Sequence, residues 1–247
     1  MKTPMLLVAS LFIAAGVASA ANVEVTSSTI DIFGDGRQED VSIVMVAGKL
    51  HDDKDSMGCG SGLKHQGRFV VIVTFPEGQA VTTSLWPDDK SIFFYANPWE
   101  IAFTDYNHDG ITDFNLGQYD SCNGSYYTLF SFKPDGKVFE IGHASLTGYD
   151  NSTRNFTVTD EGYSSIIHNS TNGGPTEIFY RWDAASQFFQ PYRQTVCYGC
   201  VGSDRHREVE MRYNKTTGEF VPVKEIERVL NRKTKNFEVI KERTISP

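Results

Sequence analysis

Residues 105–113 constrain the fold of this chain more than any other stretch, because they place acidic and amide side chains at a fixed spacing. The stretch reads Asp-Tyr-Asn-His-Asp-Gly-Ile-Thr-Asp. Oxygen-bearing side chains stand at loop positions 1, 3, 5 and 9, and Gly110 stands at position 6, where the chain reverses most easily without a Cβ. This spacing matches the first part of the calcium-loop pattern. The alternative is an Asp/Asn/Gly turn that holds no metal. The predicted calcium ligands are Asp105, Asn107, Asp109, Asp113 and the backbone carbonyl of Ile111.

The residues on either side of this loop predict strands rather than the helices of an EF-hand. Leu116 occupies position 12, where an EF-hand has a bidentate Glu. Residues 100–104 and 114–117 are short apolar and aromatic runs. We therefore predict a calcium loop inside a β protein. Tyr106 and His108 fall between the ligand positions, and we expect both side chains to be exposed.

Strand patterns dominate the rest of the chain. Runs of β-branched and aromatic residues occur at 41–46, 69–75 and 126–132, each bounded by turn residues. A hairpin spacing also recurs, in which two apolar residues seven positions apart enclose a polar turn and are expected to face each other. The predicted fold class is all-β, with antiparallel hairpins in a propeller-like or sandwich-like domain. The four hairpins run from Phe132 to Phe139, Trp182 to Phe189, Tyr213 to Phe220 and Leu230 to Phe237.

A second acidic turn resembles the first. Aligned on its Asp-Gly pair, it offers Asp31, Asp35 and Glu39 at positions 1, 5 and 9. Position 3 is Phe33, which cannot bind a metal. The turn is either a degenerate copy or a weaker cation site, and we favour a purely structural turn.

The N-terminus has the pattern of a secretory signal peptide over residues 1–20. Lys2 is followed by the apolar run 6–17 and by the small residues Ala18-Ser19-Ala20, which fit a cleavage site. The expected location is therefore periplasmic or secreted. We expect a β-propeller-like calcium-loop domain at 21–192 and a basic C-terminal β-hairpin extension at 193–247, packed on the same domain.

Charge is distributed unevenly between these two parts. Residues 21–192 carry 10 basic and 23 acidic side chains, a net charge of −13, whereas residues 193–247 carry 12 basic and 8 acidic, a net charge of +4. The acidic part would repel phosphates, which argues against a nucleic-acid partner. It would attract a cationic protein by electrostatic steering.

Four cysteines in an exported chain predict two disulfides. Cys197 and Cys200 can pair locally across Tyr-Gly, which leaves Cys59 with Cys122, although other pairings stay open. A redox role for the Cys-x-x-Cys pair is disfavoured, because strand-like residues rather than a helix surround it.

The calcium loop and the segments after it resemble the FG-GAP and VCBS-like repeats of β-propellers. More narrowly, residues 95–190 resemble a group of bacterial periplasmic proteins that carry one such loop, some of them similar to lysozyme inhibitors and to immunity proteins against peptidoglycan hydrolases. The resemblance implies the calcium ligands named above and a contact loop for the hydrolase. One candidate contact segment follows the 105–113 loop, so that calcium could stiffen it, and a second is Ser61-Gly62; the alternative is an ordinary hairpin with no contact role. The residues of the first segment are Asn123, Gly124, Ser125 and Tyr126.

No catalytic centre emerges from the sequence, and we expect no enzyme. The histidines form no H-x-x-x-H pair, and no G-x-S-x-G segment is present. The favoured hypothesis is an exported calcium-binding β protein that binds and inhibits a lysozyme-type cell-wall hydrolase. The alternative is a calcium-dependent adhesion or carbohydrate-binding module. The implied cofactor is calcium, and no membrane span is expected after the signal.

Overall fold

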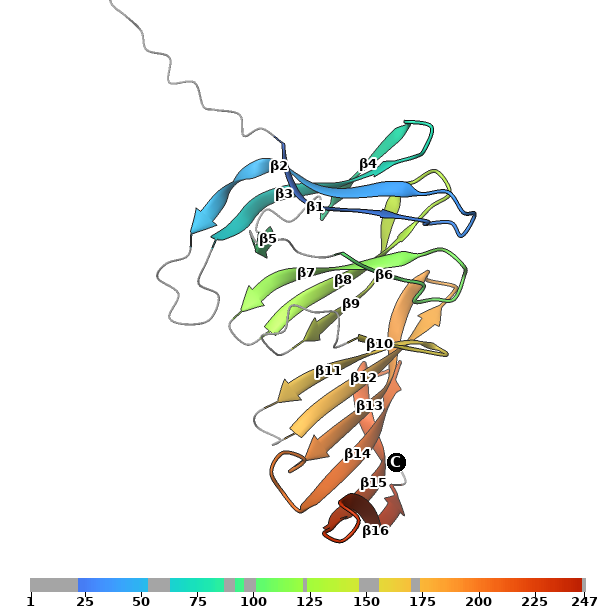
Figure 1. The fold of residues 1–247 in the computed structure, drawn as a ribbon. Coiled ribbons are helices and arrows are strands. Elements are labelled where there is room, and N and C mark those ends of the chain that lie inside the picture. Colours follow the sequence, from blue (N-terminus) through green and yellow to red (C-terminus); the bar gives the residue numbers. More distant parts are fainter. Residues whose placement is uncertain are drawn as a thin grey trace, which may run out of the picture.

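The protein is a succession of three antiparallel β-sheets that follow one another along the chain (Figure 1). The computed structural model describes residues 22–52, 63–86, 92–95, 101–121, 124–146, 156–169 and 174–245. Strands adjacent in the chain are paired within each sheet, except that β5 pairs with β3. No helix occurs among the described residues, so the all-β, antiparallel prediction is confirmed. The described strands form open sheets and do not close into a propeller ring.

The first sheet is built around the long hairpin of β2 and β3. Val41 pairs with Val73 and Ile43 with Val71, and all four side chains are 0% exposed. Alternation along each strand puts these side chains on one face, which forms the core. The strands are β1 (Val23–Ile30), β2 (Glu39–Asp52), β3 (Leu63–Thr74), β4 (Ala80–Leu85) and β5 (Ile92–Tyr95).

The second sheet carries the aromatic centre of the molecule. The Phe114 ring lies 5.2 Å from that of Phe130 and 5.1 Å from that of Phe132, measured between centroids. This cluster shares one core with the first sheet. The strands are β6 (Ala102–Thr104), β7 (Asp113–Ser121), β8 (Gly124–Phe132) and β9 (Val138–Leu146).

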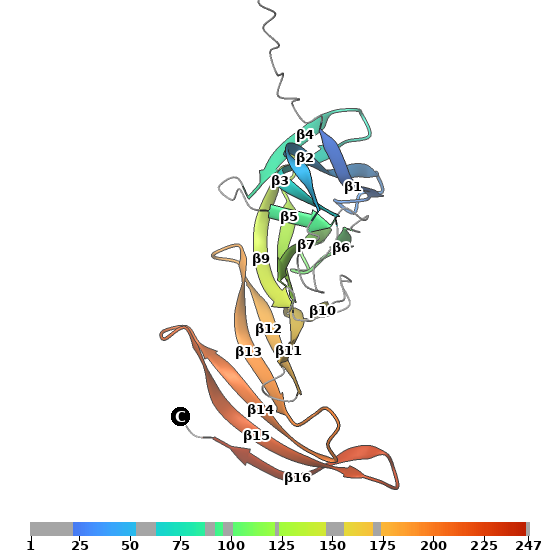
Figure 2. The ribbon, with the colours of Figure 1, turned by 90° about the vertical axis from the view of Figure 1, so that its left-hand side faces the viewer.

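The third sheet extends away from the other two and curves as it does so (Figure 2). A small aromatic core, including Tyr163 and Phe189, joins it to Leu129 and Ile141 of the second sheet. The boundary predicted at residue 193 falls inside β13, so residues 193–247 continue the same sheet. The strands are β10 (Phe156–Thr159), β11 (Gly162–Asn169), β12 (Gly174–Asp183), β13 (Phe188–Tyr198), β14 (Arg205–Asn214), β15 (Glu219–Asn231) and β16 (Asn236–Thr244).

All four predicted hairpins are present, and three have the predicted facing pair. Trp182 faces Phe189, Tyr213 faces Phe220 and Leu230 faces Phe237. In the remaining hairpin Phe132 faces Val138 instead of Phe139. The reason is a shorter turn, in which Gly136 N donates to Lys133 O at 2.8 Å.

Several predictions concern residues that the structure does not describe. These are the signal peptide at 1–20, Cys59, the candidate contact segment Ser61-Gly62, Cys122 and Asn123. The expected Cys197–Cys200 disulfide is confirmed. Within the described part of the chain, no helix is long and apolar enough to cross a membrane.

Candidate functional site

The predicted calcium loop connects β6 to β7, and its backbone N–H groups point at its own acidic side chains. The two carboxylate oxygens of Asp105 accept from Asp109 N at 3.2 Å and from Gly110 N at 2.9 Å. Asp109 Oδ1 accepts from Ile111 N at 2.8 Å. Gly110 has a φ of +86°, a conformation that glycine adopts without strain. The acidic side chains of the loop therefore fix its backbone through these hydrogen bonds.

Asp113 closes the loop from inside the protein. Its side chain is 0% exposed, and its Oδ2 accepts from Tyr106 N at 2.9 Å. Its Oδ1 is buried and has no hydrogen-bond partner. Burial raises the pKa of Asp113 to about 7, and the charges of Asp109 and Asp105 act in the same direction, whereas the nearby Ser131 hydroxyl and the Tyr106 N–H act to lower it. A buried carboxylate oxygen without a partner is a costly group, and a cation would satisfy it.

The donor set of this loop fits a hard cation. It offers three carboxylates, an amide oxygen and the Ile111 carbonyl, and calcium binds six to eight oxygens of these kinds with water completing the shell. The three carboxylates do not all come within 4.8 Å of one another in this structure, so binding would have to draw them together. The residues that would hold calcium are Asp105, Asn107, Asp109, Ile111 and Asp113.

The second acidic turn, between β1 and β2, repeats the hydrogen bonds of the 105–113 loop. Asp31 accepts from Asp35 N at 3.1 Å and from Gly36 N at 2.8 Å. Glu39 is 0% exposed; its Oε2 accepts from Ile32 N at 3.0 Å, and its Oε1 has no partner. Each of these bonds has its counterpart at the same position of the 105–113 loop. The two turns are therefore structural copies.

The two loops are in direct contact, and they differ in the ligands and charge that each presents to a cation. Thr112 N donates to Ile32 O at 2.8 Å, so the loops are joined directly. In the Asp31 loop, the position-3 side chain is Phe33, which stacks on Phe75 with centroids 6.3 Å apart. The Arg37 guanidinium lies 2.9 Å from Asp35 and lowers the pKa of that carboxyl. This loop thus lacks one ligand and already holds a positive charge.

The structure contradicts one expectation for the 105–113 loop. His108 is exposed, as expected, and its Nε2 lies 2.8 Å from Thr159 O. Tyr106, however, is only 2% exposed. Its hydroxyl accepts from Asn115 Nδ2 at 2.6 Å, and its ring packs against Tyr163 at 5.8 Å. The prediction was wrong because a tyrosine at loop position 2 can turn inward, as Ile32 does in the other loop.

The candidate contact segment lies far from the 105–113 loop. Asp113 begins β7 and pairs with Thr104, whereas Gly124 begins β8 and pairs with Ser121 at the other end of β7. The nine residues of β7 span about 30 Å. Ser125 and Tyr126 follow in β8, and their side chains lie outside the described set. Calcium would therefore act on this segment only through β7.

A groove of about 540 Å³ lies on the third sheet. Arg193 and Arg212 are cross-strand neighbours, and Nε of Arg193 is buried without a partner. Arg181 pairs with Glu161 at 2.5 Å. The arginines that line the groove outnumber its glutamates, and this net positive charge beside two tyrosine rings suits an anionic group. The groove is lined by Glu161, Arg181, Tyr192, Arg193, Glu210, Arg212 and Tyr213.

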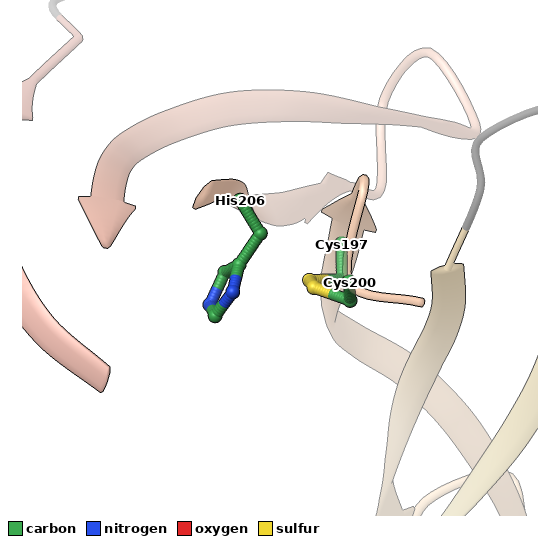
Figure 3. A group of neighbouring side chains, drawn as sticks. All are labelled: Cys197, Cys200 and His206. Atoms are coloured by element: carbon green, nitrogen blue, oxygen red, sulfur yellow. A yellow bond between two sulfur atoms is a disulfide. The ribbon is translucent and has the colours of Figure 1, made fainter. Parts of the chain in front are cut away.

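The structure brings together two sulfurs and an imidazole that the sequence did not predict to be close: those of Cys197, Cys200 and His206 (Figure 3). The Cys-x-x-Cys pair was visible in the sequence, but nothing there assigned His206 to it. The pairing register of β13 and β14 brings the histidine to the sulfurs.

No protein-family model and no curated protein matches the chain. Among solved structures, it is similar to a protein of unknown function from Bacteroides fragilis, with 10% identity, a TM-score of 0.25, and coverage of 60% of this chain and 94% of that one. It is also similar to a Xanthomonas protein related to the type IV secretion system, with 16% identity, a TM-score of 0.34, and coverage of 92% and 98%. At these TM-scores neither likeness carries an argument about function.

Proposed function

We propose that this chain is an exported calcium-binding β protein that binds another protein, with a lysozyme-type cell-wall hydrolase as the specific partner. The observation that carries the calcium part is Asp113, a buried carboxylate whose Oδ1 has no hydrogen-bond partner. The loop also has a carboxylate or an amide at every position where a side chain would bind calcium. The Asp31 loop has a buried acid at the same position, Glu39, so the complete set of side-chain ligands is what distinguishes the 105–113 loop.

In this proposal the chain's own residues fix the backbone of the loop, and calcium draws its carboxylates together. Asp105 and Asp109 fix the backbone through its N–H groups, Tyr106 anchors the loop in the core, and Thr112 ties it to the neighbouring loop. Calcium, when bound, supplies a divalent charge that offsets three carboxylates. Its role is to hold the first two sheets together and so present a fixed surface, since preorganisation lowers the ordering cost of binding.

Electrostatics support a cationic partner. Residues 21–192 carry a net charge of −13. A field of this sign speeds association with positively charged proteins, and salt weakens the effect.

The groove on the third sheet favours the second candidate function, a calcium-dependent adhesion or carbohydrate-binding module. Its arginines and tyrosines would suit an acidic sugar, because guanidinium groups pair with carboxylates and rings stack on sugars. Arg181, however, is already stacked over Tyr192 at 4.5 Å, so the ring is not a bare platform. We therefore rank this function second.

Two separate measurements test the proposal. The calcium part is tested by thermal melting: Asp109→Ala should lower the melting temperature in calcium and remove most of the calcium response, and an unchanged response would reject this ligand set. The partner part is tested by peptidoglycan clearance with a panel of lysozyme-type hydrolases. Dose-dependent inhibition of one of them, weakened at high salt and by Tyr126→Ala, is expected. No inhibition across the panel, together with binding to acidic glycans, would favour the second function.

A further inference from the structure

The turn between β13 and β14 holds a cluster of groups that bind metals (Figure 3). One ligand atom from each of Cys197, Cys200 and His206 lies within 4.8 Å of the others. Cys197 is 7% exposed and His206 is 8% exposed, so the cluster is largely shielded from water.

Strand pairing explains how these residues meet. Cys197 pairs with Glu208 across β13 and β14, and His206 stands two residues before Glu208, on the same face of the sheet. Cys200 returns to the cluster through the turn at Gly199, whose φ is +72°. Gly174 leaves the space open on the neighbouring strand, since a Cβ there would come within 3.1 Å of Cys200 Cβ.

His206 is oriented as a metal ligand. Its Nε2 lies 3.1 Å from Glu208 Oε1, an oxygen that also accepts from Arg228 Nε at 3.0 Å. Its Nδ1 is buried and has no hydrogen-bond partner. Glu208 therefore favours the tautomer with the proton on Nε2 and a lone pair on Nδ1. A ligating histidine commonly donates its other N–H to a carboxylate in this way.

We propose that the dithiol form of Cys197 and Cys200, together with Nδ1 of His206, is a zinc site, with Glu208 as a positioning residue. Two thiolates and an imidazole are ligands that zinc prefers and that calcium and magnesium do not. Three protein ligands leave a fourth position for water or for a ligand from a partner. The site belongs to the third sheet and does not depend on the proposed calcium function.

Zinc binding and the Cys197–Cys200 disulfide are mutually exclusive, because zinc needs both cysteines as free thiolates. An external dithiol attacks one sulfur of the Cys197–Cys200 bond and forms a mixed disulfide, which its second thiol then resolves. The protein gains two electrons and two protons, and the reductant leaves as a disulfide. Zinc then displaces the two thiol protons. The site is therefore occupied only where a dithiol reductant acts on the chain.

Zinc titration of the full chain tests the proposal, with a chromophoric zinc indicator as competitor and calcium in excess to fill the acidic loop. Reduced wild type should bind one zinc ion more than the reduced Cys197→Ser/Cys200→Ser variant, which keeps Cys59 and Cys122. Oxidised wild type should show no such extra site. Equal zinc binding by the reduced wild type and the double variant would overturn the proposal.

Two single variants separate the roles of the histidine and the carboxylate. We expect His206→Ala to weaken zinc binding at least tenfold and Glu208→Gln to weaken it by roughly 10-fold to 100-fold. Glu219→Gln, at the exposed start of β15, is the matched control and should not change the affinity. Circular dichroism of each oxidised variant first establishes that it is folded. Wild-type affinity in a folded His206→Ala variant would contradict the assignment.

Discussion

Glu39 and Asp113 occupy equivalent places in two adjoining loops. Each is fully buried, each accepts the N–H of the second loop residue, at 3.0 Å and 2.9 Å respectively, and each keeps one oxygen without a partner. The loops differ at position 3, which is Asn107 in one and Phe33 in the other. Because the backbone geometry is shared, a difference in cation binding would follow from the missing position-3 ligand and from the Arg37 charge beside Asp35.

The Asp113→Asn variant should lose the calcium response and keep its calcium-free stability. Asparagine can still accept from Tyr106 N, but it removes the buried charge that a cation would need. At a calcium concentration of about 100 times Kd, binding stabilises a protein by about 2.7 kcal/mol. Thermal melting with calcium and with a chelator should show that gain in wild type and in Glu39→Gln, and none in Asp113→Asn. A wild-type shift in Asp113→Asn would exclude this carboxylate as a ligand.

Calcium stoichiometry should rise from one to two ions per chain when the Asp31 loop is completed. The double variant Phe33→Asn/Arg37→Ile adds the missing position-3 oxygen and removes the guanidinium that pairs with Asp35. Isothermal titration calorimetry measures the number directly, with Arg37→Ile alone as the control. Two ions on wild type would show that the Asp31 loop binds calcium as it stands.

Local chemistry made much of this structure predictable from the sequence. The loops at 31–39 and 105–113, and the hairpins after Trp182, Tyr213 and Leu230, depend on contacts within about ten residues. Turn residues and strand alternation determine such elements directly.

What sequence reasoning missed depends on contacts between distant strands. The inward turn of Tyr106 requires Tyr163 from β11, and the position of His206 beside Cys197 requires the register of β13 against β14. The distance between the 105–113 loop and residue 124 requires the full length of β7. Register follows from packing over whole strands, which local patterns do not specify.

The Tyr106→Phe variant should be less stable than wild type by about 1–3 kcal/mol, the range for leaving a buried polar group unsatisfied. It removes the acceptor of Asn115 Nδ2, and Asn115 is only 1% exposed. Urea unfolding in the presence of a calcium chelator measures the change without the metal contribution. The matched control is Tyr213→Phe, whose ring packs on Phe220 in a peripheral hairpin. Equal midpoints for the two variants would mean that the Tyr106–Asn115 bond adds no net stability.

Gly67→Ala should destabilise the β2–β3 hairpin by about 1–3 kcal/mol, the usual cost of overpacking, or by more. Gly67 faces Gly48 across the hairpin beside a bulge in β2, and a Cβ there would lie 2.1 Å from Ala47 O and 2.8 Å from Gly48 Cα. Both are backbone atoms, so no side chain can rotate away, and the strands must separate next to the Met45–Phe69 pair of the core.

Gly78→Asn is the control, because Gly78 has a φ of +88° with no atom within 4 Å, and asparagine tolerates that conformation. Urea midpoints should fall clearly for Gly67→Ala and little for Gly78→Asn. A wild-type midpoint for Gly67→Ala would mean that β2 and β3 are further apart at this point than the structure places them.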